Sequence, residues 1–435
     1  MIETAKVLLW GSLIGAVTWQ PDRNTGVFQF APDFLGSHIE IAPLTMPLRD
    51  FPYEFPALAW PAFHGLPGLL ADSLPDKWGN AVIDAWLATQ NRPADSFSPV
   101  ERLCYIGKRG MGALEFEPAI RGLPTQSKRV DLEKMVTLAN RILDERANLQ
   151  GVFTGEDDKD AIENILRIGT SAGGARAKAI LAWNPETNEF RSGQIDQEVG
   201  FQYWLMKFDG ISNNRDKELS DPLGYGKVEY AYYLMASDAG ITMAPCRLHR
   251  EGGRSHFMTR RFDRTPDGEK LHMQSLGAIA HFDFTQAGAY SYEQALQVIR
   301  RLDLPREDLE QQVLRAIFNV VARNQDDHVK NIAFLMNKLG EWRLSPAFDL
   351  TYAMNPEGKW TSRHQMSINN KLDHFEREDL LALGRNAGIK NNQTAGMLDR
   401  VLQTVQNWPQ YAAKAGVPED WMRRIRATFR LNLPG

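Results

Sequence analysis

The sequence has very little cysteine and no long apolar run. Its 435 residues include two cysteines, Cys104 and Cys246, which cannot form a disulfide framework and suit a reducing compartment. The longest apolar stretch, residues 7–17, is interrupted by glycine and serine and spans about half of the ~20 residues that a membrane helix needs. We therefore expect a cytoplasmic protein with no membrane segment.

The chain also lacks an excess of charge of one sign. The 50 Lys and Arg nearly balance the 54 Asp and Glu. The net charge of −4 therefore lacks the overall positive charge that is typical of proteins that bind nucleic acid or membrane surfaces. The nine histidines are dispersed, without an H-E-x-x-H motif or paired cysteines, so a zinc site has little support. The length and the 43% apolar content predict an ordered chain of two or three domains.

The order of the periodic patterns predicts an α+β architecture in three parts. Residues 1–150 form a β-rich accessory subdomain, 151–265 a strand-rich lobe, and 266–435 an all-helical lobe, with the active site in the cleft between the lobes. Alternating apolar residues predict strands, and apolar residues three and four apart predict helices. The expected strands are 7–10, 13–19, 27–30, 179–183, 203–208, 246–249 and 256–262, and the expected helices include 76–89, 130–149, 228–239, 291–302, 376–388, 392–408 and 418–431.

A glycine-rich loop at residues 169–178 is the first candidate site. Three glycines among its first six residues allow a close approach to a ligand, and successive backbone N–H groups can cradle phosphate oxygens while Lys178 adds a charge. The loop is not a Walker motif, because no Gly-Lys-Ser/Thr follows. Its Gly-x-Ser-x-Gly pattern around Ser171 also matches a serine hydrolase elbow, but that elbow needs a helix after the serine and here a strand is expected.

A second candidate follows a long helical pattern that ends near residue 323. Asp326 and Asn331 have the D-x-x-x-x-N spacing of a kinase catalytic loop, in which the Asp receives the substrate hydroxyl proton and the Asn binds a metal. Asp349 comes after an expected hairpin, residues 332–336 and 342–344, where a kinase has its magnesium-binding Asp.

The order of these parts along the chain favours a phosphotransferase. A glycine loop is followed by a strand lysine, Lys207, by a helix glutamate, Glu229, and by a candidate adenine hinge at residues 260–263. The catalytic-loop pattern and the metal Asp come last. A polyphosphate with about four negative charges needs backbone N–H groups, lysine and Mg²⁺ to hold it, and a carboxylate to orient the attacking hydroxyl.

Four motifs together resemble the HipA family of bacterial serine/threonine kinase toxins. They are Ser171-x-x-Gly174-Ala175-x-x-Lys178, Arg261-Phe262-Asp263-Arg264, Asp326-x-His328-x-Lys330-Asn331 and Ser345-Pro346-x-Phe348-Asp349. The resemblance covers nearly the whole chain, with supporting likeness at Leu74-Pro75-Asp76 in the accessory subdomain. It implies a two-lobed, protein-kinase-like fold with an accessory N-terminal subdomain.

The resemblance also implies site residues for ATP and Mg²⁺. It assigns Asp326 as the catalytic base, Asn331 and Asp349 as Mg²⁺ ligands, and Lys207 as the ATP-phosphate lysine, with Lys178 assisting. The further residues that it places at the nucleotide site are Ser171, Gly173, Gly174, Ala175, Glu229, Arg260, Phe262, Asp263, His328 and Lys330.

Within that set, the resemblance gives four residues particular roles. Arg260 and Phe262 meet adenine through their backbone, Asp263 meets the ribose, and Ser171 is the autophosphorylated serine. Phosphorylation adds a charge of about −1.5 to −2, which would repel ATP from a loop that holds phosphate and switch the enzyme off. The roles of Arg176, Asp327, His328 and Lys330 stay open.

By the same resemblance, the expected partners are a small HipB-like helix-turn-helix antitoxin, operator DNA bound through the antitoxin complex, and a protein substrate. In some relatives that substrate is an aminoacyl-tRNA synthetase, which does not transfer by motif. Two alternatives stay open. One is a kinase-like module that binds antitoxin and DNA without phosphotransfer, and the other is a serine hydrolase that uses Ser171.

Overall fold

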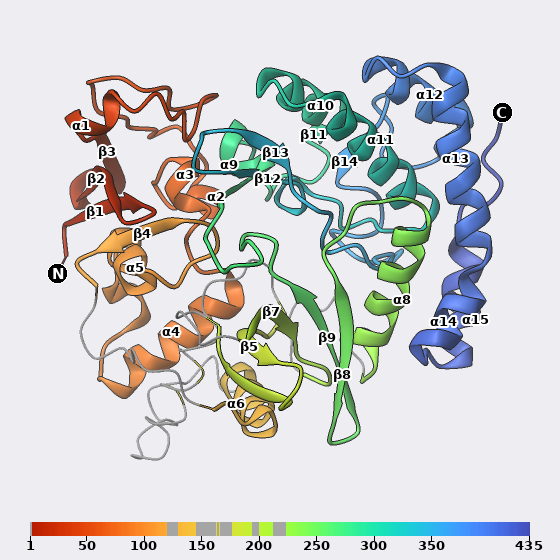
Figure 1. Cartoon of the computed structure of the whole chain (residues 1–435), viewed down its shortest axis with the longest axis horizontal. Coiled ribbons are helices and arrows are strands. Elements are labelled where there is room, and N and C mark those ends of the chain that lie inside the picture. Colours follow the sequence, from red (N-terminus) through yellow and green to blue (C-terminus); the bar gives the residue numbers. More distant parts are fainter. Residues whose placement is uncertain are drawn as a thin grey trace.

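The computed structural model describes most of the chain (Figure 1). The described residues are 2–119, 129–144, 162, 165, 176–193, 200–211 and 223–435. Figure 1 shows the N-terminal sheet at one end, the C-terminal helices at the other and a second sheet between and below them. In the part of the chain that is described, no helix combines the length and apolarity that a membrane crossing needs.

The accessory subdomain contains an antiparallel sheet in the order β3-β2-β1-β4. Its strands are β1 (Thr4–Leu9), β2 (Ser12–Gln20), β3 (Thr25–Phe30) and β4 (Leu114–Glu117). The predicted meander of three strands is therefore confirmed. The β1–β2 turn places Trp10 and Gly11 at φ 51° and 82°, the left-handed pair that a type I′ hairpin needs.

Short helices follow the meander, and three longer helices complete the first third of the chain. The helices are α1 (Pro32–Leu35), α2 (Trp60–Phe63), α3 (Gly68–Ala71), α4 (Lys77–Thr89), α5 (Pro99–Ile106) and α6 (Leu132–Asp144), with 3-10 turns η1 (Pro21–Arg23) and η2 (Ala94–Ser96). Asp76 caps α4, and a capping box between Ser98 and Glu101 starts α5.

The strand-rich lobe, here called the nucleotide lobe after its predicted role, is built on a five-stranded antiparallel sheet in the order β6-β5-β7-β9-β8. Its elements are β5 (Lys178–Asn184), β6 (Glu189–Ser192), β7 (Gln202–Lys207), α8 (Tyr225–Asp238), β8 (Cys246–Glu251) and β9 (Arg254–Arg260). Asp209 fixes α8 against the sheet, because its carboxylate accepts from the N–H groups of Gly224, at 2.7 Å, and Ser255, at 2.8 Å.

The apolar core of this lobe includes helices that lie before the domain boundary expected near residue 150. Residues of α4 and α6, including Trp78 and Ile142, are buried in one core with Ala179, Leu181 and Met206 of the five-stranded sheet. The accessory sheet has a separate core. Helices α4 and α6, which precede residue 150, therefore pack on the sheet of the nucleotide lobe, because their apolar faces are buried against the apolar surface of that sheet.

The second lobe is mostly helical. Its helices are α9 (Leu276–Ala280), α10 (Tyr292–Arg301), α11 (Arg306–Val321), η4 (Val329–Asn331), α12 (Arg377–Asn386), α13 (Asn391–Gln406), α14 (Trp408–Ala415) and α15 (Glu419–Thr428). The capping box expected between Ser291 and Gln294 is present at the start of α10. The lobe also contains short strands, which an all-helical lobe would lack: β10 (His272–Ser275), β11 (Tyr290–Ser291), β12 (Ala333–Met336), β13 (Trp342–Leu344) and β14 (Met366–Ser367).

These short strands position the segments on either side of them. The hairpin β12–β13, which the sequence predicted, pairs with β10 in the order β10-β12-β13. The residues before β12 and after β13 therefore leave the same small sheet and lie close together. They are the two segments with the kinase-like acidic residues.

Candidate active site

Lys207, at the end of β7, bonds one carboxylate of its own lobe and one carboxylate of the second lobe. Its Nζ donates to Glu229 Oε1 of α8 at 2.5 Å and to Asp349 Oδ1, which comes from the loop after β13. Glu229 is 2% exposed, whereas the Asp349 side chain is 31% exposed. A strand lysine, a helix glutamate and a loop aspartate from distant parts of the sequence thus meet at one point.

The charges in this cluster stabilise one another. Burial acts to lower the pKa of Lys207, but Asp349 and Glu229 outweigh it and hold that pKa above its ordinary value. Burial acts to raise the pKa of Asp349, and the ammonium of Lys207, followed by that of Lys178, brings it below the ordinary value. The ammonium and the Asp349 carboxylate are therefore both ionised at neutral pH.

Asp349 has a backbone conformation that is uncommon outside glycine. Its φ of 53° lies in the left-handed region, which costs free energy and persists where the surroundings impose it, often at functional sites. Arg176, whose role the sequence left open, contacts the same cluster. Its Nη1 is 3.7 Å from Glu229 Oε2, and its guanidinium lies 4.0 Å from the centre of the Tyr225 ring.

Asp326 begins the candidate catalytic loop and its side chain is 40% exposed. One carboxylate oxygen, Oδ1, accepts from Gln365 Nε2 at 2.7 Å. Asn331 closes the loop, because its Nδ2 donates to the Asp326 carbonyl at 2.8 Å. The carboxylate of Asp326 is thus held at one oxygen and faces outward, which is the arrangement that a general base needs.

His328 and Lys330, two further polar residues of the loop, contact its surroundings. His328 Nδ1 accepts from the Lys330 N–H at 3.3 Å, and its Nε2 is 3.8 Å from Asp326. The Lys330 ammonium lies 4.8 Å from the centre of the Phe284 ring and 3.9 Å from Asp72 of the accessory subdomain. The His328 side chain therefore lies beside Asp326, and the predicted contact of His328 and Lys330 with a nucleotide stays a prediction.

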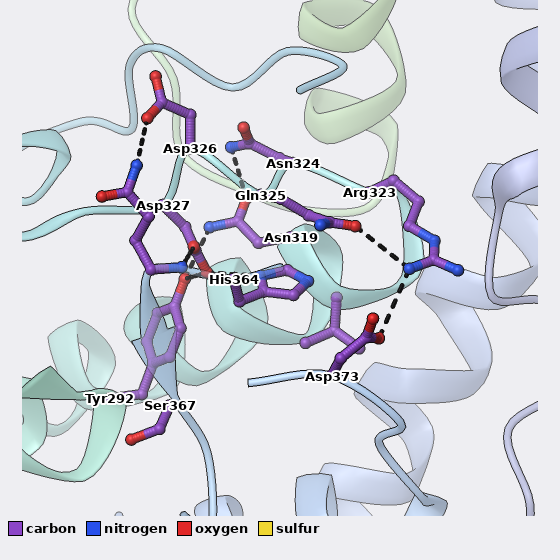
Figure 2. A network of polar contacts seen from close by, with 12 residues as sticks. Tyr292, Asn319, Arg323, Asn324, Gln325, Asp326, Asp327, His364, Ser367 and Asp373 are labelled. Carbon is purple, nitrogen blue, oxygen red and sulfur yellow. Dashed lines mark hydrogen bonds and ion pairs between the residues drawn. The ribbon is translucent and has the colours of Figure 1, made fainter. Parts of the chain in front are cut away.

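Asp327 anchors the loop in the core of the second lobe (Figure 2). Its carboxylate accepts from Tyr292 Oη at 2.8 Å and from the Gln365 N–H at 2.8 Å, and lies 2.7 Å from His364 Nδ1. Arg430 has only donors, so His364 Nε2 accepts from it and His364 Nδ1 carries the proton. Burial acts to raise the pKa of Asp327, but these partners hold it below the ordinary value.

Residues of the catalytic loop and of the segment that contains Asp349 line one small cavity. They include His328 and Asn331 from the loop and Ala347, Phe348 and Leu350 from the segment. The two predicted metal ligands, Asn331 and Asp349, therefore belong to segments that share one cavity. Among the described residues, no three His, Cys, Asp or Glu side chains gather as metal ligands. The donors present are one carboxylate and one amide oxygen, which fit Mg²⁺ because that ion keeps several waters and binds phosphate oxygens as well.

The hinge segment, residues 260–263, ends in an internal ion cluster. Asp263 is fully buried, and its carboxylate accepts from Arg261, Arg264 and the N–H of Gly112 in the accessory subdomain. Burial acts to raise the pKa of Asp263, but the two guanidinium groups lower it well below its usual range. Both oxygens serve an internal ion cluster that joins the accessory subdomain to the lobe. The contact of Asp263 with the ribose stays a prediction.

The adenine contact through Arg260 and Phe262 stays a prediction. The Arg260 N–H already donates to the Pro245 carbonyl at 2.8 Å, so that group is engaged within the lobe. The Phe262 ring lies 5.4 Å from the ring of Phe348, which precedes Asp349. An aromatic pair thus connects the hinge with the Asp349 segment.

Several predicted residues fall in a part of the chain that the structure does not describe. Ser171, Gly173, Gly174 and Ala175 lie outside the described residues. Lys178, which follows them, opens β5 and is bonded to Asp76 at 3.2 Å. Because a strand begins at Lys178, the local order differs from the strand–Ser–helix order of a hydrolase elbow.

Three residues at the site were not predicted from the sequence. Gln365 and His364 follow a glycine-poor loop with no motif that marks them, and only the folded chain places them at Asp326 and Asp327. The sequence did mark Asp76, because it belongs to the Leu74-Pro75-Asp76 segment that resembles the family. Its ion pair with Lys178 could not be predicted, because the two residues are 102 positions apart in the sequence.

Comparison with known proteins identifies the family. Residues 5–117 match the HipA N-terminal domain family, and residues 170–408 match the HipA-like C-terminal domain family. A curated protein of Sinorhizobium fredii (strain NBRC 101917 / NGR234), named "Putative kinase Y4mE", is 27% identical over 136 residues. That match covers 29% of this chain and spans about a third, 32%, of the relative's length.

A solved structure shares the fold over nearly the entire chain. It is the Shewanella oneidensis MR-1 toxin–antitoxin complex of HipA, HipB and operator DNA, in which one chain matches with a TM-score of 0.68 at 18% identity. The match covers 97% of this chain and 95% of that chain, and it confirms the two-lobed kinase-like architecture. Because the C-terminal domain family alone spans more than half of the sequence, the chain belongs to the HipA family.

Proposed function

We propose that the chain is an ATP- and Mg²⁺-dependent protein serine/threonine kinase and the toxin half of a toxin–antitoxin pair. The observation that carries this proposal is the meeting of Lys207, Glu229 and Asp349 next to the catalytic loop. A paired lysine and glutamate beside a metal-binding aspartate are the parts that a kinase must align for phosphoryl transfer. Membership of the HipA family and the kinase name of the Sinorhizobium relative support it.

Each residue of the cluster has a distinct task in this proposal. Lys207 binds ATP phosphate oxygens, and Glu229 fixes its direction. Asp349 and the amide oxygen of Asn331 would hold Mg²⁺, which neutralises phosphate charge when it is bound. Because Lys207 bonds Asp349 directly in the structure, nucleotide binding would exchange part of that ion pair for phosphate contacts.

Asp326 accepts the proton of the attacking hydroxyl. Its outward carboxylate is held at one oxygen by Gln365, so the other oxygen is directed to the substrate. Removal of a positioned general base lowers turnover by roughly 10²- to 10⁴-fold. Ser171 would be the first acceptor, and phosphate on the glycine-rich segment would repel ATP.

Phosphate transfer can be tested with the purified full-length chain, radiolabelled ATP and Mg²⁺. The wild type should become labelled, and mass spectrometry should place the phosphate on Ser171. Asp326→Asn should reduce labelling by at least roughly 10²-fold. Glu357→Gln, which changes an exposed acid away from the cluster, should label like the wild type. Equal labelling of Asp326→Asn and the wild type would contradict the role of Asp326.

The partners follow from the solved relative, which is a complex of HipA with HipB and operator DNA. We propose that this chain binds a HipB-like helix-turn-helix antitoxin and reaches operator DNA through it, and that it phosphorylates a cellular protein. A helix-turn-helix protein encoded beside this chain should co-purify with it and shift operator DNA more strongly in its presence. Nucleotide binding without any turnover would instead favour a kinase-like binding module.

A further inference from the structure

The start of α4 brings the accessory subdomain to the nucleotide lobe. Asp76, the residue before α4, accepts from the Gly79 N–H at 2.6 Å and from Lys178 Nζ at 3.2 Å. Trp78, in the first turn, donates from Nε1 to the Lys178 carbonyl at 3.0 Å. One helix start therefore holds both the side chain and the main chain of Lys178.

Lys178 lies directly opposite Lys207 in the β5–β7 pairing. Cross-strand partners point to the same face of a sheet, and like charges in that position are destabilising unless each has a counter-charge. Lys207 has Glu229 and Asp349. Lys178 has Asp76, in a pair whose side chains are 3% and 8% exposed.

The Lys178 ammonium faces the same cluster as Lys207. Burial acts to raise the pKa of Asp349, and Lys178 is the second cause, after Lys207, that lowers it, so the charge of Lys178 acts on the predicted metal ligand. An ammonium group carries three donors, and a bond to Asp76 is compatible with a further bond to a phosphate oxygen. Two adjacent lysines on one sheet face suit a polyphosphate better than either lysine does alone.

We propose that Asp76 is a positioning residue, supplied by the accessory subdomain, that sets the Lys178 ammonium beside Lys207 to bind the phosphates of ATP. This inference rests on the proposed kinase function and adds that the accessory subdomain completes the nucleotide site. Asp76 is held firmly relative to Lys178, because α4 is buried in the same core as β5 and β7. Asp72, four residues earlier, accepts from the Ser275 N–H at 2.7 Å and Oγ at 2.8 Å, so the same short segment also fastens to the second lobe.

The test uses Asp76→Asn in the full-length chain. Asparagine keeps a side-chain oxygen for the Gly79 N–H, so the helix cap is retained while the charge that orients Lys178 is lost. We expect the KM for ATP to rise roughly tenfold with a smaller change in kcat, because a ground-state contact to ATP is weakened. Asp84→Asn is the matched control, since Asp84 lies on the same helix and pairs with Arg102 at 3.2 Å, and it should leave the KM unchanged.

A second pair of variants separates positioning from folding. Lys178→Met should raise the KM for ATP by itself, and Asp76→Asn combined with Lys178→Met should show the same KM as Lys178→Met. The double variant removes both members of a buried ion pair and leaves no unpaired buried charge, so it should fold even if Asp76→Asn is unstable. An additional loss in the double variant would show that Asp76 acts other than through Lys178 and would overturn the inference.

Binding of a fluorescent ATP analogue distinguishes this inference from the proposed function. If the wild type binds the analogue and Asp76→Asn binds it equally well or more tightly, Asp76 does not position Lys178 and only this inference fails. If the wild type neither binds the analogue nor transfers phosphate, the proposed kinase function fails as well. Weaker binding by Asp76→Asn, with Asp84→Asn unchanged, supports the inference.

Discussion

Gln365 holds one oxygen of Asp326 and is itself fixed through its backbone N–H by Asp327. Gln365→Leu removes the donor while the backbone bond remains. Misplacement of a catalytic group by about 1 Å can cost roughly 10²-fold, so we expect kcat to fall between roughly 10- and 100-fold with the KM for ATP nearly unchanged. Steady-state kinetics of phosphate transfer measures both constants.

The control for this prediction is Gln403→Leu, the same exchange at an exposed position of α13. It should leave kcat at the wild-type value. A Gln365→Leu enzyme with normal kcat would show that Asp326 needs no such support, and a parallel rise in KM would indicate a wider disturbance of the nucleotide site.

The segment after α15 fastens the end of the chain to the catalytic loop. Arg430 donates to the Val320 carbonyl at the end of α11, at 2.8 Å, and to His364 Nε2 at 3.0 Å, and it pairs with Asp373. A guanidinium at a helix C-terminus also interacts favourably with the helix dipole. The C-terminal residues therefore belong to the support of Asp327, which His364 contacts.

Loss of this guanidinium should weaken the second lobe. Hydrogen bonds to charged groups contribute about 1.5–3 kcal/mol each, so we expect Arg430→Met to lower the free energy of unfolding by roughly 2–4 kcal/mol. Urea unfolding followed by circular dichroism measures this change. Arg426→Met, at an exposed position of α15, should change stability little, and an equal loss in both variants would contradict the specific role of Arg430.

Three histidines with a lowered pKa make the stability of the whole molecule depend on pH. Burial is the first cause that lowers the pKa of His256 to about 4, of His272 to about 3 and of His281 to about 4. His281 also accepts from the Gly68 N–H at 3.0 Å, which joins the accessory subdomain to the second lobe. Protonation would abolish that acceptor.

The sign of the effect follows from linkage. The unfolded chain binds protons near pH 6.5, whereas these folded histidines stay neutral to about pH 4, so stability is complete above pH 6.5 and falls as the pH decreases towards 4. Each histidine contributes up to about 1.4 kcal/mol per pH unit. The thermal midpoint should therefore decrease between pH 7 and pH 5. His281→Gln should flatten this dependence and the exposed His374→Gln should not; a constant midpoint over that range would contradict the prediction.

Local patterns were sufficient for the elements and for the residues in motifs. The β-meander, α4, α8 and the β12–β13 hairpin follow from periodicity and turn residues, and the spacing of Asp326, Asn331 and Asp349 was visible in the sequence. Asp263 shows the limit of a motif. Its neighbours along the chain suggested a ligand contact, and only its surroundings in space show it at the centre of an ion cluster.

The sequence by itself determined the class of chain, the order of its elements and the residue types available for phosphate chemistry, because these depend on neighbours within a few positions. Only the tertiary structure decided which charges meet. The bonds of Lys178 to Asp76, of Lys207 to Asp349 and of Asp326 to Gln365 join residues 102, 142 and 39 positions apart. Such contacts are set by the packing of α4 on the sheet and of one lobe on the other, and no local pattern encodes that packing.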